Sequence, residues 1–381
     1  MTDNIQTSDF PQFSVLQENL LRAIRGLYKF IDKHDKVFSH IAIRTTNGNR
    51  LELFASDGQT VQKAYCGAKV DKQGSVLLDA KTLYDILPLL SPERMDVYPT
   101  EFEGEKAIGI HCGAARVRLT SKIAVSEFPF PAEHNGQFLG SVDYKMLKTL
   151  TAHLHRFQDK RAYQDYPKSI FIRFEAYQVV LLATDGYAVA RATLPMYQEN
   201  AIEPITLRVN NSAFNTLLQS MNADNPKDVG FSFDSTTKTL LVTSDTQDIR
   251  IEAICAKMPE PPVTTVYTAT LHNVSDAVRF LKAHKDKVLK LEGHCLILRN
   301  GNDIEQAQTI TVSESLPYMS INSGYVAPVY YTLQLLKTWG ENCTIRKDIW
   351  DKKGAALYAT GTNKGYTLEC WFGAFDIKPT D

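Results

Sequence analysis

The fold of this chain is decided by the stretch LLATDGYAVA, which occupies residues 181–190. Two apolar runs are separated there by Thr184-Asp185-Gly186, and this pattern predicts two strands joined by a tight turn. Glycine accepts a positive φ without a Cβ clash, and an Asp carboxylate can accept hydrogen bonds from nearby backbone N–H groups. A related pattern occurs 128 residues earlier, where LELFA (residues 51–55) is followed by Ser56-Asp57-Gly58. This recurrence indicates an internal repeat.

Other landmarks return in the same order. Phe13-Ser14-Val15 and Gly140-Ser141-Val142 each introduce apolar residues at three- and four-residue spacing, which predicts a helix with one buried face. The first of these helices is expected over residues 14–31, with Leu16 on its apolar side. Asp79 and Asn210 are good N-cap residues and predict the starts of two further helices.

Phe128-Pro129 and Met258-Pro259 each close a round of short predicted strands. A less regular third round has helices near residues 272–285 and around Tyr331. The sequence therefore predicts an α+β fold of three repeated domains, each with two helices packed on antiparallel sheet. The predicted domains span residues 1–136, with a loose tail over 1–11, then 137–263 and 264–381.

The composition is that of an ordinary globular protein, because 44% of the 381 residues are hydrophobic and 22% are charged. A formal net charge of −1 excludes a protein that binds polyanions over its whole surface, but it permits a segregated basic face. The six cysteines form no C-x-x-C pair, which argues against structural zinc and a disulfide framework. The N-terminal residues lack the pattern of a signal peptide, so a cytoplasmic protein is expected.

The segment ATDGYAVA (residues 183–190) is similar to A-T-D-G-H-R-L-A of the bacterial sliding clamps, the β subunits of DNA polymerase III. Ser126-Glu127-Phe128-Pro129 resembles the A-x-D-F-P that ends the first domain of that family. The resemblance covers nearly the whole chain and implies a head-to-tail homodimer that closes a ring around duplex DNA. Two departures concern the family's pocket: Tyr187-Ala188 replace His-Arg, and WFGAF (residues 371–375) replaces a terminal M-P-M-R-L.

The predicted helices carry basic residues opposite their apolar faces. Arg22, Arg25 and Lys29 are three and four residues apart and therefore share one side of the first helix. A solvated helix face usually mixes both signs of charge, so these faces favour sequence-independent contact with DNA phosphates, with a plain solvated surface as the alternative. The predicted DNA-contacting residues are Arg22, Arg25, Lys29, Lys81, Lys145, Lys148, Arg156, Lys160, Arg161, Arg279, Lys282, Lys285 and Lys337.

The resemblance further implies a processivity factor without enzymatic activity or cofactor, which tethers DNA polymerase, clamp loader and repair proteins through short peptide motifs. The peptide pocket that it implies is formed by Pro167, Thr184, Gly186, Tyr187, Ala188, Val189, Pro259, Val263, Trp371, Phe372, Gly373 and Ala374. Phe280 and Leu281 are weak candidates for the dimer interface.

Two rival functions stay open. One is a clamp-like protein that binds peptides without encircling DNA. The other is a hydrolase that uses Asp185, although no His or Ser recurs beside Asp57 and Asp185 as a catalytic partner. The sequence also has no nucleotide-binding glycine loop and no H-E-x-x-H motif.

Overall fold

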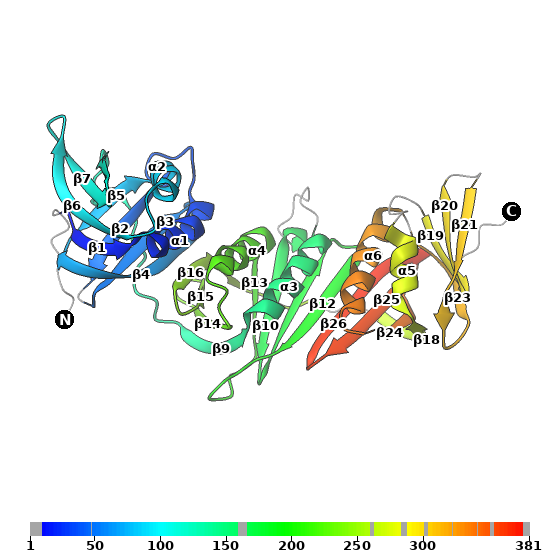
Figure 1. Ribbon diagram of the computed structural model, residues 1–381. Helices are drawn as coiled ribbons and strands as arrows, with labels where there is room; N and C mark the ends of the chain where they lie inside the picture. The colour runs from blue at the N-terminus through cyan, green and yellow to red at the C-terminus, as the bar shows by residue number, and fades with distance from the viewer. Residues whose placement is uncertain are drawn as a thin grey trace. The chain divides into compact units, whose positions relative to one another are not determined.

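The computed structural model describes residues 10–46, 48–158, 166–259, 263–282, 288–300, 304–321, 323–340, 342–350 and 354–375. The chain forms two compact units, one from Met1–Tyr144 and Thr216–Ala253 and one from Lys145–Asn215 and Ile254–Asp381. The α-helices are α1 (Gln17–Leu27), α2 (Ala80–Ile86), α3 (Tyr144–Leu154), α4 (Asn211–Ser220), α5 (Val274–Lys282) and α6 (Ser323–Lys337) (Figure 1).

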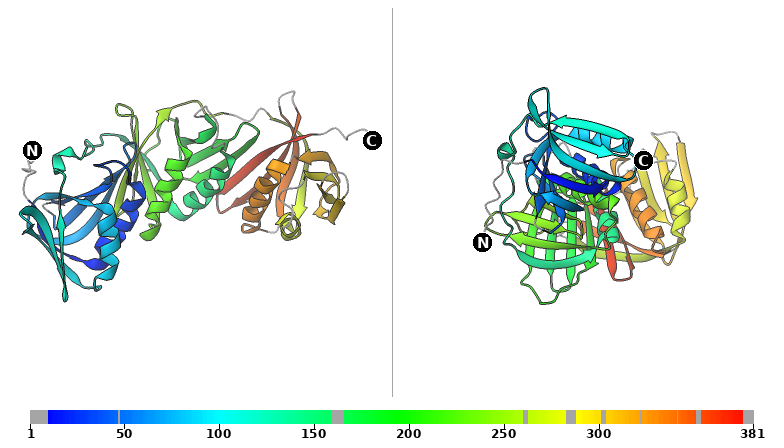
Figure 2. Two further views of the ribbon diagram at one scale, coloured as in Figure 1. Left: turned by 90° about the horizontal axis from the view of Figure 1, so that it is seen from above. Right: turned by 60° about the vertical axis from the view of Figure 1, so that its left-hand side comes forward.

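The first unit is built on a 12-stranded sheet whose main path is β8-β7-β6-β1-β4-β16-β15-β14-β9, while β2 pairs with β3 and β5, and β3 with β4. Its strands are β1 (Gln12–Leu16), β2 (His40–Thr46), β3 (Arg50–Ser56), β4 (Val61–Lys72), β5 (Ser75–Asp79), β6 (Arg94–Phe102), β7 (Glu105–Cys112), β8 (Ala115–Thr120), β9 (Gln137–Asp143), β14 (Asp228–Asp234), β15 (Thr239–Thr243) and β16 (Gln247–Glu252). Helices α1 and α2 lie side by side against this sheet (Figure 2).

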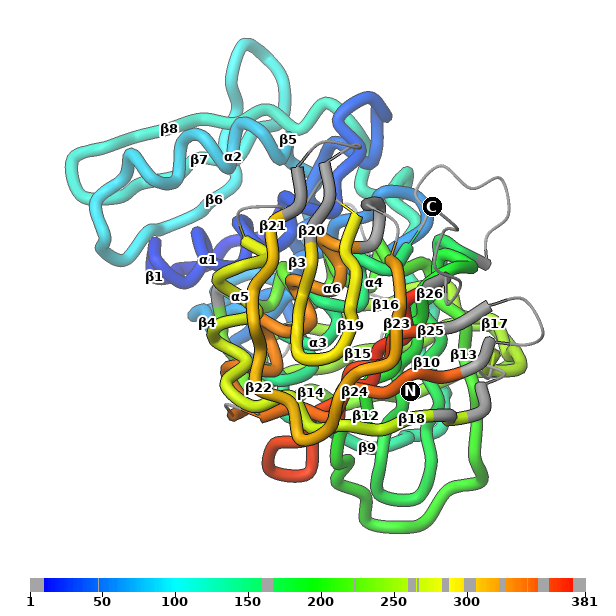
Figure 3. Tube along the Cα trace, turned by 90° about the vertical axis from the view of Figure 1, so that its right-hand side faces the viewer, coloured from blue at the N-terminus to red at the C-terminus, as the bar shows by residue number. Residues whose placement is uncertain are grey.

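The second unit has a 14-stranded sheet with the main path β17-β13-β10-β11-β12-β26-β23-β19-β20-β21, and β24 connects β18 to β25. Its strands are β10 (Ser169–Glu175), β11 (Gln178–Thr184), β12 (Ala188–Pro195), β13 (Ile205–Asn210), β17 (Ile254–Cys255), β18 (Val263–His272), β19 (Val288–Gly293), β20 (Cys295–Asn300), β21 (Ile304–Thr309), β22 (Thr311–Val312), β23 (Leu316–Ile321), β24 (Asn342–Trp350), β25 (Gly354–Asn363) and β26 (Tyr366–Phe375). Figure 3 shows β19, β20, β21 and β23 running next to one another.

Two strand pairs join segments that are distant in the sequence. Strand β4 pairs antiparallel with β16, and β12 pairs antiparallel with β26. In the first unit, strands of the predicted second domain therefore share a sheet with strands of the predicted first domain. In the second unit, other strands of the predicted second domain share a sheet with strands of the predicted third domain. The predicted class, helices packed on antiparallel sheet, is confirmed, while the three-domain boundaries stay a prediction.

The start of the first helix was predicted wrongly. Residues 12–16 form β1, which pairs with β4 and β6, and α1 begins only at Gln17. Leu16 is 53% exposed and does not lie on the buried face of the helix. Phe13, Ser14 and Val15 are all buried in β1, so pairing with strands on both sides overrides the helical spacing at this point. An isolated helical pattern cannot reveal the two partner strands.

The predicted N-caps are confirmed. The Asp79 carboxylate accepts a hydrogen bond from the backbone N–H of Thr82 at 2.7 Å, and the Asn210 side chain accepts one from Ala213 at 3.0 Å. Each bond satisfies a backbone donor that the first turn of a helix leaves without a partner. Among the described residues, no helix is long and apolar enough to cross a membrane.

Candidate functional site

The Thr184-Asp185-Gly186 turn joins β11 to β12 through its own side chains. The Thr184 hydroxyl donates to the Ala188 carbonyl at 2.7 Å and accepts from the Gly186 N–H at 3.0 Å. One Asp185 carboxylate oxygen accepts from the N–H groups of Tyr187 and Ala188 at 2.9 and 2.7 Å. Gly186 has a φ of 93°, which favours glycine. The turn is therefore held by side-chain hydrogen bonds.

The Ser56-Asp57-Gly58 turn repeats this arrangement in the first unit. The Ser56 hydroxyl donates to the Thr60 carbonyl at 2.9 Å, and Asp57 accepts from the N–H groups of Gln59 and Thr60 at 2.9 and 2.7 Å. Both carboxylates thus stabilise a turn, which accounts for the Asp in each motif without assigning it any catalytic role.

The predicted pocket residues around the second turn differ in accessibility. Thr184, Ala188 and Val189 are buried, whereas Gly186 is exposed and Tyr187 is 70% exposed at the tip of the turn. A side chain at the tip can meet a partner without any rearrangement of the sheet. Tyr187 is therefore the large apolar group that this turn offers to solvent.

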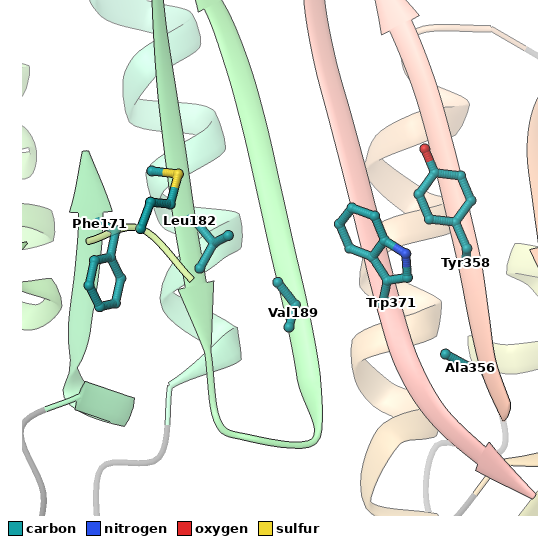
Figure 4. Packing of buried hydrophobic residues seen from close by; sticks show 7 residues of the cluster. Phe171, Leu182, Val189, Ala356, Tyr358 and Trp371 are labelled. Carbon is teal, nitrogen blue, oxygen red and sulfur yellow. The ribbon is translucent and has the colours of Figure 1, made fainter. Parts of the chain in front are cut away.

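Strand β26 lies next to β12, so the C-terminal residues reach the same region. Val189 is paired with Trp371, and Ala188 is paired with Phe372. Because neighbouring strand residues point to opposite faces, Trp371 and Phe372 belong to different layers. Trp371 packs with Phe171, Leu182, Val189, Met258, Ala356 and Tyr358 (Figure 4).

Phe372 instead faces the layer of α3, where its ring centroid lies 5.8 Å from that of Phe157, in the 3-10 turn that follows α3. It is fully buried, so it presents no surface to a peptide. Phe372, which the resemblance places in the peptide pocket, therefore lies on the opposite sheet face from Trp371, and its role in a pocket stays a prediction. Trp371 and Val189 share the other face of the sheet, where both are buried.

A polar network borders the Trp371 cluster. The indole Nε1 of Trp371 donates to the fully buried Asp348 carboxylate at 3.0 Å, and the Arg346 guanidinium donates to the same oxygen at 3.1 Å. The guanidinium carbon of Arg346 also lies 3.6 Å from the centroid of the Tyr358 ring. These charge-assisted contacts fix the orientation of both aromatic rings.

A second ion pair crosses from β12 to β26. Arg191 donates to the Glu369 carboxylate at 2.6 Å, and the Tyr358 hydroxyl donates to the other Glu369 oxygen at 2.9 Å. Burial and the Glu369 charge raise the pKa of Tyr358, which keeps its hydroxyl protonated as a donor. Sequence reasoning missed these polar residues, although Arg191 and Glu369 occupy otherwise apolar strands.

The remaining predicted pocket residues are less informative. Pro167, in the 3-10 turn Tyr166–Lys168, and Pro259 are both half-buried. Val263 begins β18 opposite Trp350, and Gly373 and Ala374 lie in β26 opposite Ala356 and Ala355. Only the backbone placement of these last three pocket residues is described.

The predicted basic residues of the first unit lie on helix surfaces. Arg22, Arg25 and Lys29 are exposed on α1 and the 3-10 turn that follows it, and Lys81 is exposed on α2. Lys29 donates to the Gln219 carbonyl at 3.0 Å, and Lys81 forms a 2.5 Å ion pair with Asp85. Arg22 and Arg25 therefore form the basic core of this surface.

The second unit carries the others. Lys145 is exposed and Lys148 is half-buried on α3, Arg279 and Lys282 are exposed on α5, and Lys337 is exposed on α6. Arg279 forms an ion pair with Asp276 on its own helix. The exposed Arg156 lies over the Tyr331 ring, 3.9 Å from its centroid. The predictions for Lys160, Arg161 and Lys285 lie outside the described residues.

The two dimer candidates sit on α5. Leu281 is fully buried in its own unit, which leaves only the half-buried Phe280 with surface for a partner. The ends of the sheets are more open: within the described part of the chain, β8 pairs only with β7 and β21 only with β20. Edge strands of this kind can pair with another chain.

A cavity of about 440 Å³ in the first unit was not predicted. Its lining includes Arg118 and Lys122 near the edge strand β8, and His40 and Asp79 near the start of α2. Burial lowers the pKa of His40, which the Asp79 charge opposes. No motif marks this cavity in the sequence, because its residues come from separate strands. Among the described residues, no group of three His, Cys, Asp or Glu side chains could hold a metal ion.

Comparisons with known proteins agree with this geometry. Residues 11–131 match the family described as the DNA polymerase III beta subunit, N-terminal domain. The solved beta chain of DNA polymerase III from Streptococcus pneumoniae is 15% identical, with a TM-score of 0.78 over 97% of this chain and 100% of that chain. The DNA polymerase sliding clamp from Bacillus subtilis is 12% identical, with a TM-score of 0.80 over 98% and 100%.

A third solved structure, the Helicobacter pylori beta clamp bound to DNA ligase peptide, is 16% identical, with a TM-score of 0.73 over 96% of this chain and 99% of that chain. Among curated protein sequences, none matches this one. At such low identity the solved structures establish the fold, and the family match covers the N-terminal part. Residues 11–131 thus match the N-terminal domain of the DNA polymerase III beta subunit, and the chain has the fold of the solved bacterial sliding clamps, which it resembles at low sequence identity.

Proposed function

We propose that this protein is a DNA sliding clamp, a non-catalytic processivity factor that closes as a head-to-tail homodimer around duplex DNA. The observation that carries the proposal is that α1, α3 and α5, the first helices of the three predicted repeats, each carry exposed cations. Long Lys and Arg side chains attract phosphates without reading bases, so the protein can slide. We expect it to act in the cytoplasm.

Ring closure is supported by two of the open sheet edges, those of β8 and β21. Strand β8 of the first unit and strand β21 of the second unit each pair with one strand only within the described part of the chain. Pairing of β8 with β21 of a second copy would extend both sheets. The same contact made twice gives a closed, two-fold symmetric ring.

Partner tethering is supported by the surface at the Thr184-Asp185-Gly186 turn. The exposed Tyr187 ring lies at the tip of the turn before β12, and Val189 of β12 is paired with Trp371 of β26 in the buried layer beneath it. Aromatic anchors carry much of the energy in peptide recognition. We expect short peptide motifs of a DNA polymerase, a clamp loader and repair proteins to bind there. The solved Helicobacter pylori clamp binds a DNA ligase peptide.

The decisive test is retention on circular DNA. Protein loaded on nicked circles should survive a salt challenge and should leave when the circle is cut, because only a topological link is independent of ionic attraction. Equal loss from circular and linear DNA would contradict encirclement and favour the clamp-like peptide binder. Encirclement also requires a homodimer, so the molar mass in solution should be twice that of one chain.

Charge-reversal variants distinguish direct contact between the α1 cations and DNA phosphates from a general effect of net charge. Arg22→Glu with Arg25→Glu should weaken retention and lower the slope of log affinity against log salt by up to about one per lost phosphate contact. Lys69→Glu with Lys72→Glu, at two exposed lysines on β4, changes the net charge by the same amount and should change neither quantity. An equal effect of both variants would show that the α1 surface is not the DNA contact.

A further inference from the structure

We propose that the stacked rings of Tyr28 and Tyr84 form a binding site for the bases of single-stranded DNA, beside the cations of α1 and α2. The inference rests on the proposed function and deepens it, since it adds a contact for the single strand that adjoins a duplex.

The two rings are an ordered pair at the junction of two helices. Tyr28 lies in the 3-10 turn Tyr28–Phe30 that continues α1, and Tyr84 lies in α2. Their ring centroids are 4.3 Å apart with an interplanar angle of 22°, which is a stacked geometry. Tyr84 is 36% exposed, so part of its side chain is accessible to solvent although its helix packs on another helix.

Cations surround the pair. The Lys33 ammonium lies over the Tyr28 ring at 5.2 Å from its centroid. Arg25 lies in the last turn of α1, three residues before Tyr28, and Lys81 precedes Tyr84 by three residues on α2, so each cation lies near its tyrosine in the sequence of its helix. Asp85 offsets the charge of Lys81. Arg25 and Lys33 therefore supply the net positive charge.

This arrangement suits a single strand better than a duplex. The ring faces of bases are already stacked inside a duplex, whereas in a single strand they can stack on an aromatic side chain. Lys33 occupies one end of the stack, so a base would stack against the opposite side, on Tyr84. The cations would hold the phosphates, and because every base has a π face, the site would accept any sequence.

The test compares labelled oligo-dT with a labelled blunt hairpin duplex by fluorescence anisotropy, using the full-length protein. Tyr84→Leu keeps apolar bulk but removes the π face, and it should weaken oligo-dT binding about tenfold, the scale of one lost base stack. Duplex binding should not change. Tyr84→Phe should bind oligo-dT as the wild type does, because the aromatic face remains.

Tyr177→Leu, at an exposed tyrosine in the turn between β10 and β11, is the matched control and should bind both DNAs normally. Tyr28→Leu, checked for an unchanged melting curve, should reproduce the Tyr84→Leu result. Unchanged oligo-dT binding in Tyr84→Leu would overturn the proposal, as would an equal loss for oligo-dT and duplex. Failure of the wild type to stay on nicked circles would instead refute encirclement, so the two failures are distinguishable.

Discussion

His153 should make the second unit sensitive to mild acid. It lies on α3 with its Nε2 atom 3.2 Å from the Thr332 hydroxyl on α6 and 3.8 Å from the Cys370 sulfur on β26. The ring is almost completely buried beside Phe157, with the centroids 5.4 Å apart. Burial, and secondarily the charge of Arg156, lower the pKa of His153 from 6.5 to about 3.

The sign and size of the effect follow from linkage. Between pH 3 and 6.5 the unfolded chain binds a proton that the folded chain does not, so the free energy of unfolding falls as the pH falls. The slope is about 1.4 kcal/mol per pH unit. Lowering the pH from 7.5 to 5 should therefore reduce the free energy of unfolding by about 2 kcal/mol through this residue alone.

The assay is urea unfolding followed by tryptophan fluorescence at pH 7.5 and pH 5. Trp339, Trp350 and Trp371 are the three tryptophans of the chain, and all of them belong to the second unit, so the signal reports on it selectively. His153→Gln cannot become charged, and it should lose about 2 kcal/mol less than the wild type between the two pH values.

His34→Gln, at an exposed histidine of the first unit, is the control and should behave as the wild type does. The reasoning is refuted if His153→Gln and the wild type lose the same stability between pH 7.5 and pH 5. That result would mean that His153 becomes protonated in the folded state without penalty.

Three further predictions concern stability. Asp79→Ala removes the cap of α2 and should destabilise the first unit by about 1 kcal/mol in calorimetry, whereas Asp79→Asn should retain most of the cap. Phe372→Ala should lower the free energy of unfolding by about 3–5 kcal/mol in the tryptophan-detected assay, because the ring is fully buried. Tyr187→Ala should change it little, because Tyr187 is exposed. Similar losses in the two variants would contradict the assignment of Phe372 to the buried layer. Gly136→Ala should lower the free energy of unfolding by about 1–3 kcal/mol in calorimetry, since an added Cβ would lie 2.6 Å from the Phe233 backbone. An unchanged melting temperature would show that the β14 backbone shifts to make room for the methyl group.

Turns and caps could be predicted from the sequence because their chemistry is local. The hydrogen bonds of Thr184 and Asp185 join residues no more than four positions apart, so the motif contains every partner that the turn needs. Asp79 and Asn210 cap helices through residues three positions away. The repeated order of these signals was enough to predict helices packed on antiparallel sheet. The motifs themselves carry the resemblance to sliding clamps.

The candidate site was predicted only in part. The sequence placed Tyr187 at the tip of a turn and the basic residues on helix surfaces, because helical spacing decides which side chains share a face. It could not decide between Trp371 and Phe372, since both are aromatic and adjacent. Only the pairing of β26 with β12 and the packing against Phe157 determine which ring lies in which layer.

What only the tertiary structure decided depends on contacts between distant residues. The pairing of β4 with β16 and of β12 with β26 leaves no local pattern, because any two strands with one apolar face can form such a ladder. The burial of His153 and Asp348 arises in the same way, from partners on other elements. Local spacing determined the helices, turns and charged faces of this protein, and long-range packing determined the sheets they share and the polar groups they enclose.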